Sequence, residues 1–180
     1  MKGELSTVTT RRLALLAVLI ALSAVGSLIK IPSLVGTPAL DSAPGYFAAL
    51  ALGAGSGALV AAVGHLLTAL TSGFPLGLPI HGLIALGMAG CALGTALLRR
   101  VAGRGVASAG GVLLNGIAFP AAFILVPGFG TAFFAAMLVP LLVASLLNVG
   151  PAWAVAATVD RLGLLMKGPA GRTSGERAPR

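Results

Sequence analysis

Long apolar segments, separated by short polar or glycine- and proline-rich connections, make up most of the chain. A transmembrane helix needs about 20 mainly apolar residues, and segments of this kind cover residues 13–29, 80–98, 106–126 and 131–165. The apolar region 45–72 is too long for one ordinary span, and its glycines at 53–57 predict a short helix followed by a longer one. We therefore expect an all-α integral membrane protein with six transmembrane helices in one bundle.

Prolines mark the expected connections and one irregular helix. The loop at 30–44 contains three prolines, and the loop at 71–79 contains two prolines and two glycines. Proline removes a backbone donor and disfavours helical geometry in the residue before it, so both segments interrupt the helices. Pro140 and Pro151 lie inside the last apolar segment, and we expect them to bend or shorten that helix.

Composition and charge support a membrane location and predict its orientation. Hydrophobic residues make up 57% of the chain and charged residues 9%, whereas charged residues are about 25% of a soluble domain. The net charge of +8 comes from cations at the ends of apolar segments, which argues against nucleic-acid binding. With both termini in the cytoplasm, the positive-inside rule is satisfied by all cations except Lys30. The expected cytoplasmic cations are Lys2, Arg11, Arg12, Arg99, Arg100, Arg104, Arg161, Lys167, Arg172, Arg177 and Arg180.

This topology predicts a multi-pass protein of the plasma membrane, with a transmembrane domain at residues 1–166 and a disordered basic cytoplasmic tail at 167–180. The sequence contains no zinc-protease signature, nucleophile elbow or P-loop, and no two carboxylates lie close together in a predicted span. We expect no catalytic residue, metal or cofactor. Cys91 is the single cysteine, and a packing role is expected for it. Active transport would then need another energy source.

Polar residues that can bind a ligand gather toward the outer half of the expected bundle. The carboxylate of Asp41 can accept hydrogen bonds, and the ring of Tyr46 can stack on a flat ligand. Because Lys30 is the only outside cation, a strongly anionic ligand would find little charge compensation. The predicted substrate-binding residues are Asp41, Tyr46, Ser72, His81, Asn115 and Asn148.

Structural roles compete with several of these predictions. Asp41 can instead cap the helix that begins near Pro44. Asn115 and Asn148 can be interhelical hydrogen-bonding residues, a role we favour for His65. Trp153 suits an anchor at the membrane interface.

The order of these features resembles the substrate-binding S component of an energy-coupling factor (ECF) transporter over residues 10–162. The similarity rests on a proline-rich loop ending in Ala39-Leu40-Asp41, the run from Tyr46 to Ala58, and Leu70-Thr71-Ser72-Gly73-Phe74-Pro75. The resemblance implies that Ala17 and Ala21, which match the family's Ala-x-x-x-Ala motif, pack against a membrane coupling subunit. It also implies two cytoplasmic ATPases as further partners, and a subunit that topples in the bilayer to deliver its ligand.

The resemblance implies a vitamin or vitamin precursor as ligand. The Asp41-Ser42-Ala43-Pro44-Gly45-Tyr46 loop is similar to that of S components associated with cobalamin precursors, so a neutral ring bearing a ribose, such as α-ribazole, is the expected ligand. Thiamine precursors, a cationic thiamine-like compound and a queuosine-type nucleoside remain open. Two other functions are alternatives to an ECF subunit. One is a stand-alone secondary carrier or channel, and the other is a membrane enzyme that depends on His65 or His81.

Overall fold

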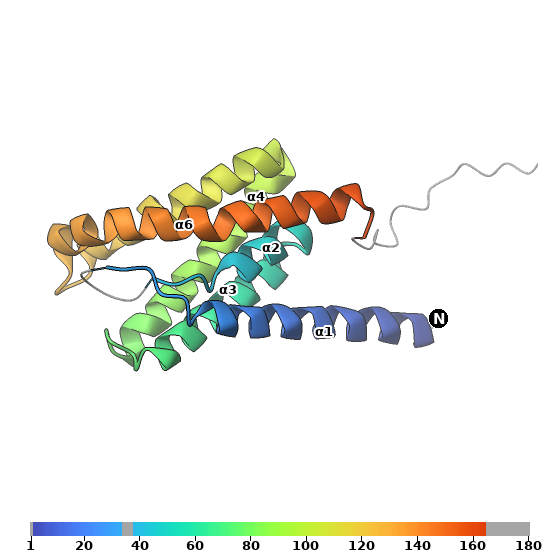
Figure 1. The fold of residues 1–180 in the computed structure, drawn as a ribbon, viewed down its shortest axis with the longest axis horizontal. Coiled ribbons are helices and arrows are strands. Elements are labelled where there is room, and N and C mark those ends of the chain that lie inside the picture. Colours follow the sequence, from blue (N-terminus) through green and yellow to red (C-terminus); the bar gives the residue numbers. More distant parts are fainter. Residues whose placement is uncertain (1, 34–37, 165–180) are drawn as a thin grey trace, which may run out of the picture.

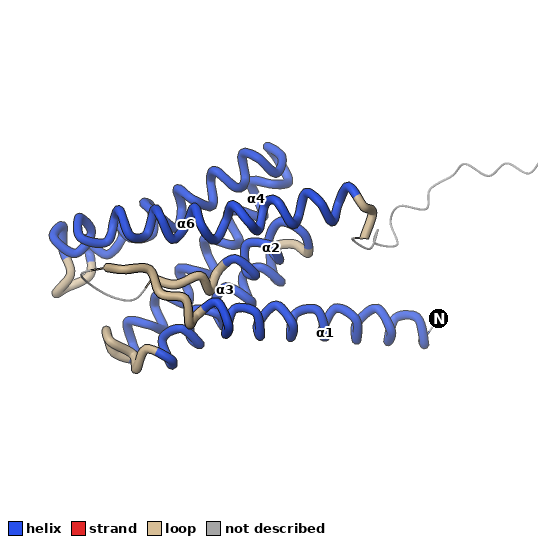
Figure 2. The backbone as a smooth tube through the Cα atoms, in the orientation of Figure 1, coloured by secondary structure: helices blue, strands red, loops and turns tan. Residues whose placement is uncertain are grey.

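The computed structural model of the chain describes residues 2–33 and 38–164, and side chains from Thr10 onward within those ranges. All secondary-structure elements of these residues are helical, as Figures 1 and 2 show. The prediction of an all-α protein is thereby confirmed. The elements are α1 (Lys2–Gly26), α2 (Ala43–Ala51), α3 (Ala54–Thr71), α4 (Leu78–Leu113), the π-helix η1 (Leu114–Ala118), α5 (Phe119–Ala122), the 3-10 helix η2 (Phe123–Leu125) and α6 (Gly130–Arg161).

Three helical segments are long and apolar enough to cross a membrane, namely Ala54–Thr71, Leu78–Leu125 and Gly130–Arg161. Many leucine and valine side chains lie exposed on the outside of the bundle, including Leu86 and Val139. An apolar surface of this extent would be unfavourable in water. Lipid tails are as apolar as leucine side chains, so a bilayer can cover it. Length and surface chemistry therefore both indicate a membrane protein.

The segment Leu78–Leu125 is two helical arms joined at Gly103. This glycine has φ 80° and ψ 175°, outside the helical region, and glycine reaches positive φ without steric cost. The chain folds back there (Figure 1). A Cβ on Gly111 would lie 2.8 Å from Thr95 Oγ1, and one on Gly94 2.8 Å from Leu114 Cδ1, so the arms pack closely. The sequence placed the same connection at 99–105.

Other boundaries differ from the predicted ones. Helix α1 begins at Lys2 rather than at residue 13, and α6 ends at Arg161 rather than near 165. Helix α6 continues through Pro140 and Pro151, so the two prolines do not shorten it. The predicted division of 45–72 is confirmed, because Leu52 and Gly53 separate α2 from α3. The predicted tail at 167–180 lies outside the described residues.

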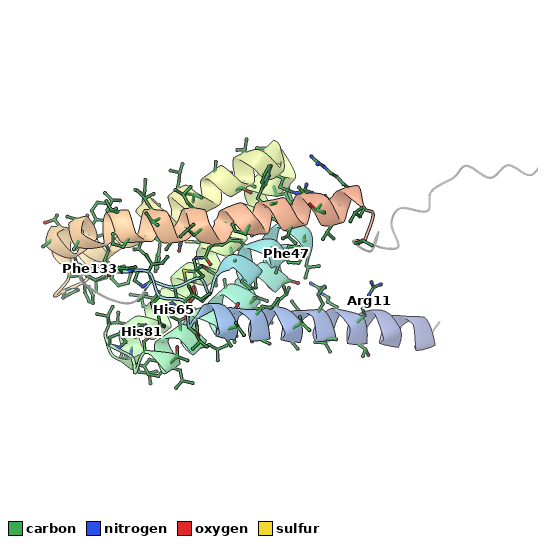
Figure 3. All side chains as sticks on the ribbon, in the orientation of Figure 1. Arg11, Phe47, His65, His81 and Phe133 are labelled. Atoms are coloured by element: carbon green, nitrogen blue, oxygen red, sulfur yellow. The ribbon has the colours of Figure 1, made fainter. Side chains whose placement is uncertain are left out.

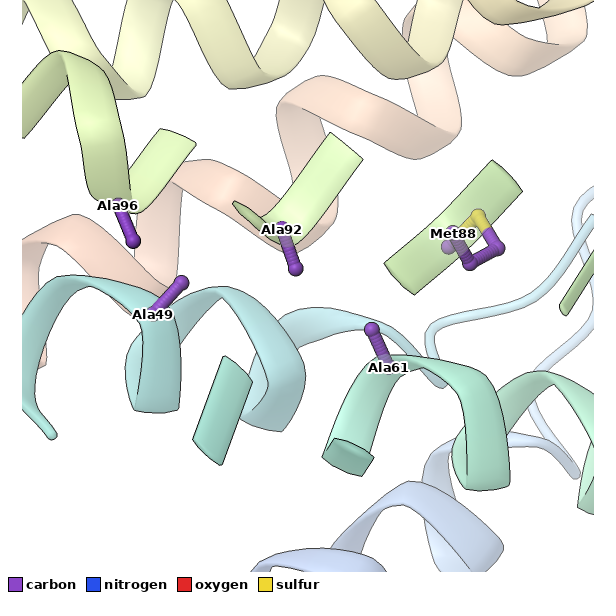
Figure 4. Packing of buried hydrophobic residues seen from close by; sticks show 5 residues of the cluster. All are labelled: Ala49, Ala61, Met88, Ala92 and Ala96. Atoms are coloured by element: carbon purple, nitrogen blue, oxygen red, sulfur yellow. The ribbon is translucent and has the colours of Figure 1, made fainter. Parts of the chain in front are cut away.

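Small residues let α2 lie directly against its neighbours. A Cβ on Gly45 would be 2.9 Å from Ala61 Cα, and one on Gly57 would be 2.6 Å from Ala49 Cα. Contacts this close explain why glycine and alanine occupy these positions. Figure 4 shows the resulting cluster, with Ala49 and Ala61 facing residues of α4. The buried members of this cluster are Ala49, Ala61, Met88, Ala92 and Ala96.

Asn148 of α6 holds the beginning of α2 in place. Its Oδ1 accepts hydrogen bonds from the backbone N–H groups of Ser42 (3.0 Å) and Ala43 (2.8 Å). Its Nδ2 donates to the carbonyl oxygens of Ala39 (3.0 Å) and Ala144 (2.8 Å). The first N–H groups of a helix lack partners within the helix, and here a side chain about a hundred residues away supplies one.

We expect Asn148→Ala to destabilise the protein by about 2–4 kcal/mol, because it leaves buried backbone donors and one carbonyl without partners. Chemical unfolding in detergent micelles measures the change. Thr158→Ala on the same helix is the matched control, since Thr158 is exposed and donates only to Ala154 O. Equal stability of the two variants would contradict the role of Asn148 in holding α2.

Candidate functional site

A cavity of about 110 Å³ lies between the segment 38–42, α3, the first arm of α4, the η1–α5 region and α6. Most of its lining side chains are apolar, and the polar ones come from the 38–42 segment, α3, α4, η1 and α6. The lining residues are Pro38, Ala39, Asp41, Ser42, His65, Thr68, Leu76, His81, Ile84, Met88, Asn115, Phe119, Pro120, Phe133, Met137, Leu141, Ala144 and Asn148.

Asp41 supplies the carboxylate of the polar wall. It follows the α1–α2 loop and its side chain is 5% exposed. The hydroxyl of Thr68, on α3, donates a short hydrogen bond to Asp41 Oδ2. Burial raises the pKa of Asp41, and this is opposed by hydrogen bonds from Thr68 and Ser42 and by the charge of Lys30. The protein therefore stabilises the charged form of Asp41 less well than water does.

Two histidines on neighbouring helices form a hydrogen-bonded pair beside this carboxylate. His65 on α3 and His81 on α4 are joined through Nε2 and Nδ1, 3.2 Å apart, with their ring centroids 5.4 Å apart. The backbone N–H of Leu76 donates to His81 Nε2 at 3.4 Å, and Phe74 packs edge-on against the His81 ring. Figure 3 labels His65 and His81 next to each other, near the end of the bundle that carries the 72–77 loop. The 72–77 loop is thus connected to the cavity wall.

Asn115 lies in the π-helix that precedes Pro120. Its Nδ2 donates to Ser145 Oγ on α6 at 2.9 Å, and Ser145 donates to Leu141 O. Within the described residues, Asn115 Oδ1 has no hydrogen-bond partner. Single π-turns inside α-helices often occur at functional sites, because the extra residue rotates the side chains that follow. Here it brings an amide and then Phe119 to the cavity.

Aromatic and sulfur-containing side chains form the apolar wall. Phe119 contacts the backbone of α4 at Gly87, where a Cβ would lie 1.9 Å from Phe119 Cζ. Phe133 and Met137 on α6 and Met88 on α4 also line the cavity. Phe123 and Phe129 pack against these rings with centroids about 5 Å apart, which fixes their positions. This wall suits a flat apolar ring.

The structure brings four of the six predicted binding residues to the cavity, namely Asp41, His81, Asn115 and Asn148. Tyr46 is instead fully buried against Val149 and Ala152. Ser72 lies at the end of α3, where Lys30 Nζ donates to its hydroxyl at 2.8 Å.

The structural alternatives are also resolved in part. Ser42, not Asp41, is the residue at the N-cap of α2, and the capping oxygen comes from Asn148. Asn148 borders the cavity, but both of its polar atoms already bond to the protein. His65 makes the expected interhelical bond and also lines the cavity. Trp153 is exposed on α6.

Several lining residues were missing from the predicted site. Thr68 lies three positions after His65, and this helical spacing of polar residues in an apolar helix was the available signal. Phe119 and Phe133 carried no comparable signal, since phenylalanine is ordinary in a membrane helix. Their role depends on how η1 and the turn at 126–129 orient the two helices.

The cavity and the arginines lie at opposite ends of the molecule. Figure 3 places His65, His81 and Phe133 near one end and Arg11 near the other. At the arginine end, Asp160 of α6 pairs with Arg104 and, at 3.4 Å, with Arg99, so it joins α6 to the turn of α4. Arg12 donates to Ser56 Oγ at 2.8 Å, which ties α1 to the start of α3.

Helix α1 leaves a row of small residues on its outer face. Ala17 and Ala21, one turn apart, are both exposed, whereas Leu16 and Leu19 face the bundle and Ser23 is fully buried. The two alanines are therefore not used for packing within this chain.

Comparisons with known proteins agree with these features. A family model described as ECF transporter, substrate-specific component, matches residues 11–159, which is most of the chain and includes the cavity and α1 alanines. Neither the curated proteins nor the solved structures gave a match. On the strength of the family model, the chain belongs to the substrate-specific components of ECF transporters.

Proposed function

We propose that the protein is the substrate-binding membrane subunit of an ECF importer. We further propose that the cavity lined by Asp41, His65 and Asn115 holds its ligand. The single observation that carries this proposal is an apolar cavity with one buried carboxylate, two histidines and a free amide oxygen at one end. In this arrangement six helices form the bundle in the plasma membrane with both termini in the cytoplasm, and α2, with nine residues, reaches only part of the way across. The arginine end then faces inward and the cavity outward.

The charges around the cavity favour a ligand that is not an anion. Among the described residues that line the cavity there is no lysine or arginine, and Asp41 contributes a carboxylate. An anionic ligand would bring a second negative charge into a poorly solvated site, which is unfavourable. A neutral compound with hydroxyl or N–H donors can instead bond to Asp41 without any charge compensation.

The walls of the cavity favour a ring, since Phe119 and Phe133 line it. At about 110 Å³ the cavity is smaller than the roughly 150 Å³ apolar cavity that holds one benzene, so a bicyclic ring has to widen it on binding. We infer that the ring of the ligand enters the apolar part, while its polar part extends toward Asp41 and the 38–42 segment. α-Ribazole, with a dimethylbenzimidazole ring and a ribose, has this division and is our proposed ligand.

The exposed alanines of α1 supply the proposed docking surface for the coupling subunit. Small side chains let two helix backbones approach closely, and neither Ala17 nor Ala21 is buried within this chain. Docking there would transmit the ATP-driven movement of the energising module, and toppling would turn the cavity inward. The substrate is released unchanged.

We expect Asp41→Asn to weaken α-ribazole binding by no more than about tenfold, because the amide oxygen still accepts hydrogen bonds. Asp41→Ala should cost roughly 10- to 100-fold, since it leaves the hydrogen-bond donors of the ligand without an acceptor. Isothermal titration calorimetry on the purified protein in nanodiscs measures both.

Asp160→Asn makes the same charge change far from the cavity and is the matched control. A loss well above tenfold for Asp41→Asn alone would contradict the proposed contact, in which Asp41 acts as a hydrogen-bond acceptor for a neutral ligand. Absence of α-ribazole binding to the unaltered protein would reject that compound as the substrate.

Replacing both Ala17 and Ala21 with leucine should leave ligand affinity unchanged and abolish uptake. Leucine side chains would keep the helices of the partner away from α1. Ligand affinity depends on the cavity, which lies elsewhere. Uptake of radiolabelled α-ribazole is measured in proteoliposomes that contain the coupling subunit, both ATPases and ATP.

Ala132 and Ala135 of α6 are also exposed, and their double leucine variant is the control that should retain uptake. Equal loss of binding and uptake in the α1 variant would show that its alanines serve the fold. Uptake by the unaltered protein without partners, driven by a proton or sodium gradient, would favour a stand-alone carrier.

A further inference from the structure

The hydrogen bonds of the two histidines determine where each ring carries its proton. His81 Nε2 accepts the backbone N–H of Leu76, so a proton cannot occupy that nitrogen. A neutral imidazole has one protonated nitrogen, and in His81 it must be Nδ1. His81 Nδ1 therefore donates to His65 Nε2, 3.2 Å away.

The same reasoning extends to His65. Because its Nε2 accepts the hydrogen bond from His81, the proton of neutral His65 lies on Nδ1. Within the described residues, His65 Nδ1 makes no hydrogen bond. It is not fully buried either, so another molecule can reach it. The ring is half-buried and borders the cavity. A chain of bonds starting at the Leu76 amide thus ends in an N–H donor on a side chain that lines the cavity.

We propose that His65 is a specificity-determining residue that donates its Nδ1–H to an acceptor atom on the ligand, and that His81 is a positioning residue that holds His65 in the donating tautomer. This inference rests on the proposed function, because it assigns one contact in the same cavity. It adds a chemical requirement: the ligand carries an uncharged ring nitrogen or carbonyl oxygen.

The donor of His65 complements the other polar groups of the wall. Asp41 and Asn115 Oδ1 are acceptors and select donors on the ligand, whereas His65 selects an acceptor. A benzimidazole riboside has both kinds of group, since its ribose donates and the free nitrogen of its ring accepts. A compound with donors alone would leave the His65 N–H without a partner in a poorly solvated site.

Nitrogen-15 NMR tests the tautomers directly. The chain contains two histidines in total, so histidine-selective labelling gives two sets of ring signals, and those that vanish in His81→Phe belong to His81. We expect His65 to be protonated at Nδ1 in the unaltered protein and to shift toward the Nε2-protonated form in His81→Phe. Protonation of His65 at Nε2 in the unaltered protein would overturn the proposal whatever the ligand is.

A matched ligand pair tests the contact. α-Ribazole is compared by calorimetry with its indole analogue, in which the free ring nitrogen is replaced by C–H. The unaltered protein should prefer α-ribazole by roughly tenfold, the value of one such hydrogen bond, and His65→Phe should bind both compounds equally. Leu66→Phe, an exposed neighbour that does not line the cavity, should keep the preference.

The outcomes separate this inference from the proposed function. Equal binding of both compounds by the unaltered protein overturns the His65 contact but leaves the substrate-binding role intact. If neither compound binds, α-ribazole is rejected as the substrate, and the NMR measurement still decides whether His65 presents its Nδ1–H. A pair that only joins α3 to α4 would lower stability in His65→Phe without changing the ratio of the two affinities.

Discussion

The side-chain amide of Asn148 is the interaction on which the arrangement of the site depends. It bonds at once to the 38–42 segment, to the first turn of α2 and to its own helix. Helix α2 has nine residues, and a helix this short has little stability of its own. Its position is determined by Asn148 at its beginning and by close contacts with α3 along its length. That position places Asp41 opposite Thr68 and so creates the polar wall of the cavity.

The cavity combines directional polar groups with non-directional apolar packing. The carboxylate, imidazole and amide are each oriented by a second residue: Thr68 for Asp41, His81 for His65, and Ser145 for Asn115. Oriented groups lose little freedom when a ligand binds, which favours affinity and selectivity. The phenylalanine and methionine side chains provide area for contact. Such a division separates recognition of a ligand's polar atoms from recognition of its shape.

The sequence predicted the fold class and much of the site because both depend on local patterns. Apolar length, prolines and Gly53 located the helices, and the arginine clusters marked one end of the bundle. Asp41, His81 and Asn115 were identifiable because polar residues are rare in this chain. The packed position of Tyr46 was not, since it depends on α2 being pressed against α3 and α6 by contacts of small residues. The phenylalanine wall was likewise hidden, because it requires the π-turn of η1 to rotate Phe119 inward.

The ion pairs of Asp160 have a mechanical consequence. They fasten the end of α6 to the turn of α4 at the end of the bundle remote from the cavity. Around the cavity, by contrast, aromatic contacts such as that between Phe123 and Phe133 join α6 to the η1–η2 region beside the hydrogen bond from Asn115 to Ser145. Apolar contacts have no donor or acceptor to satisfy, so side chains of different size can replace one another there. A scaffold of this kind can be adapted to rings of different size by substitutions at these apolar positions, while the ion pairs of Asp160 and the exposed alanines of α1 remain the same.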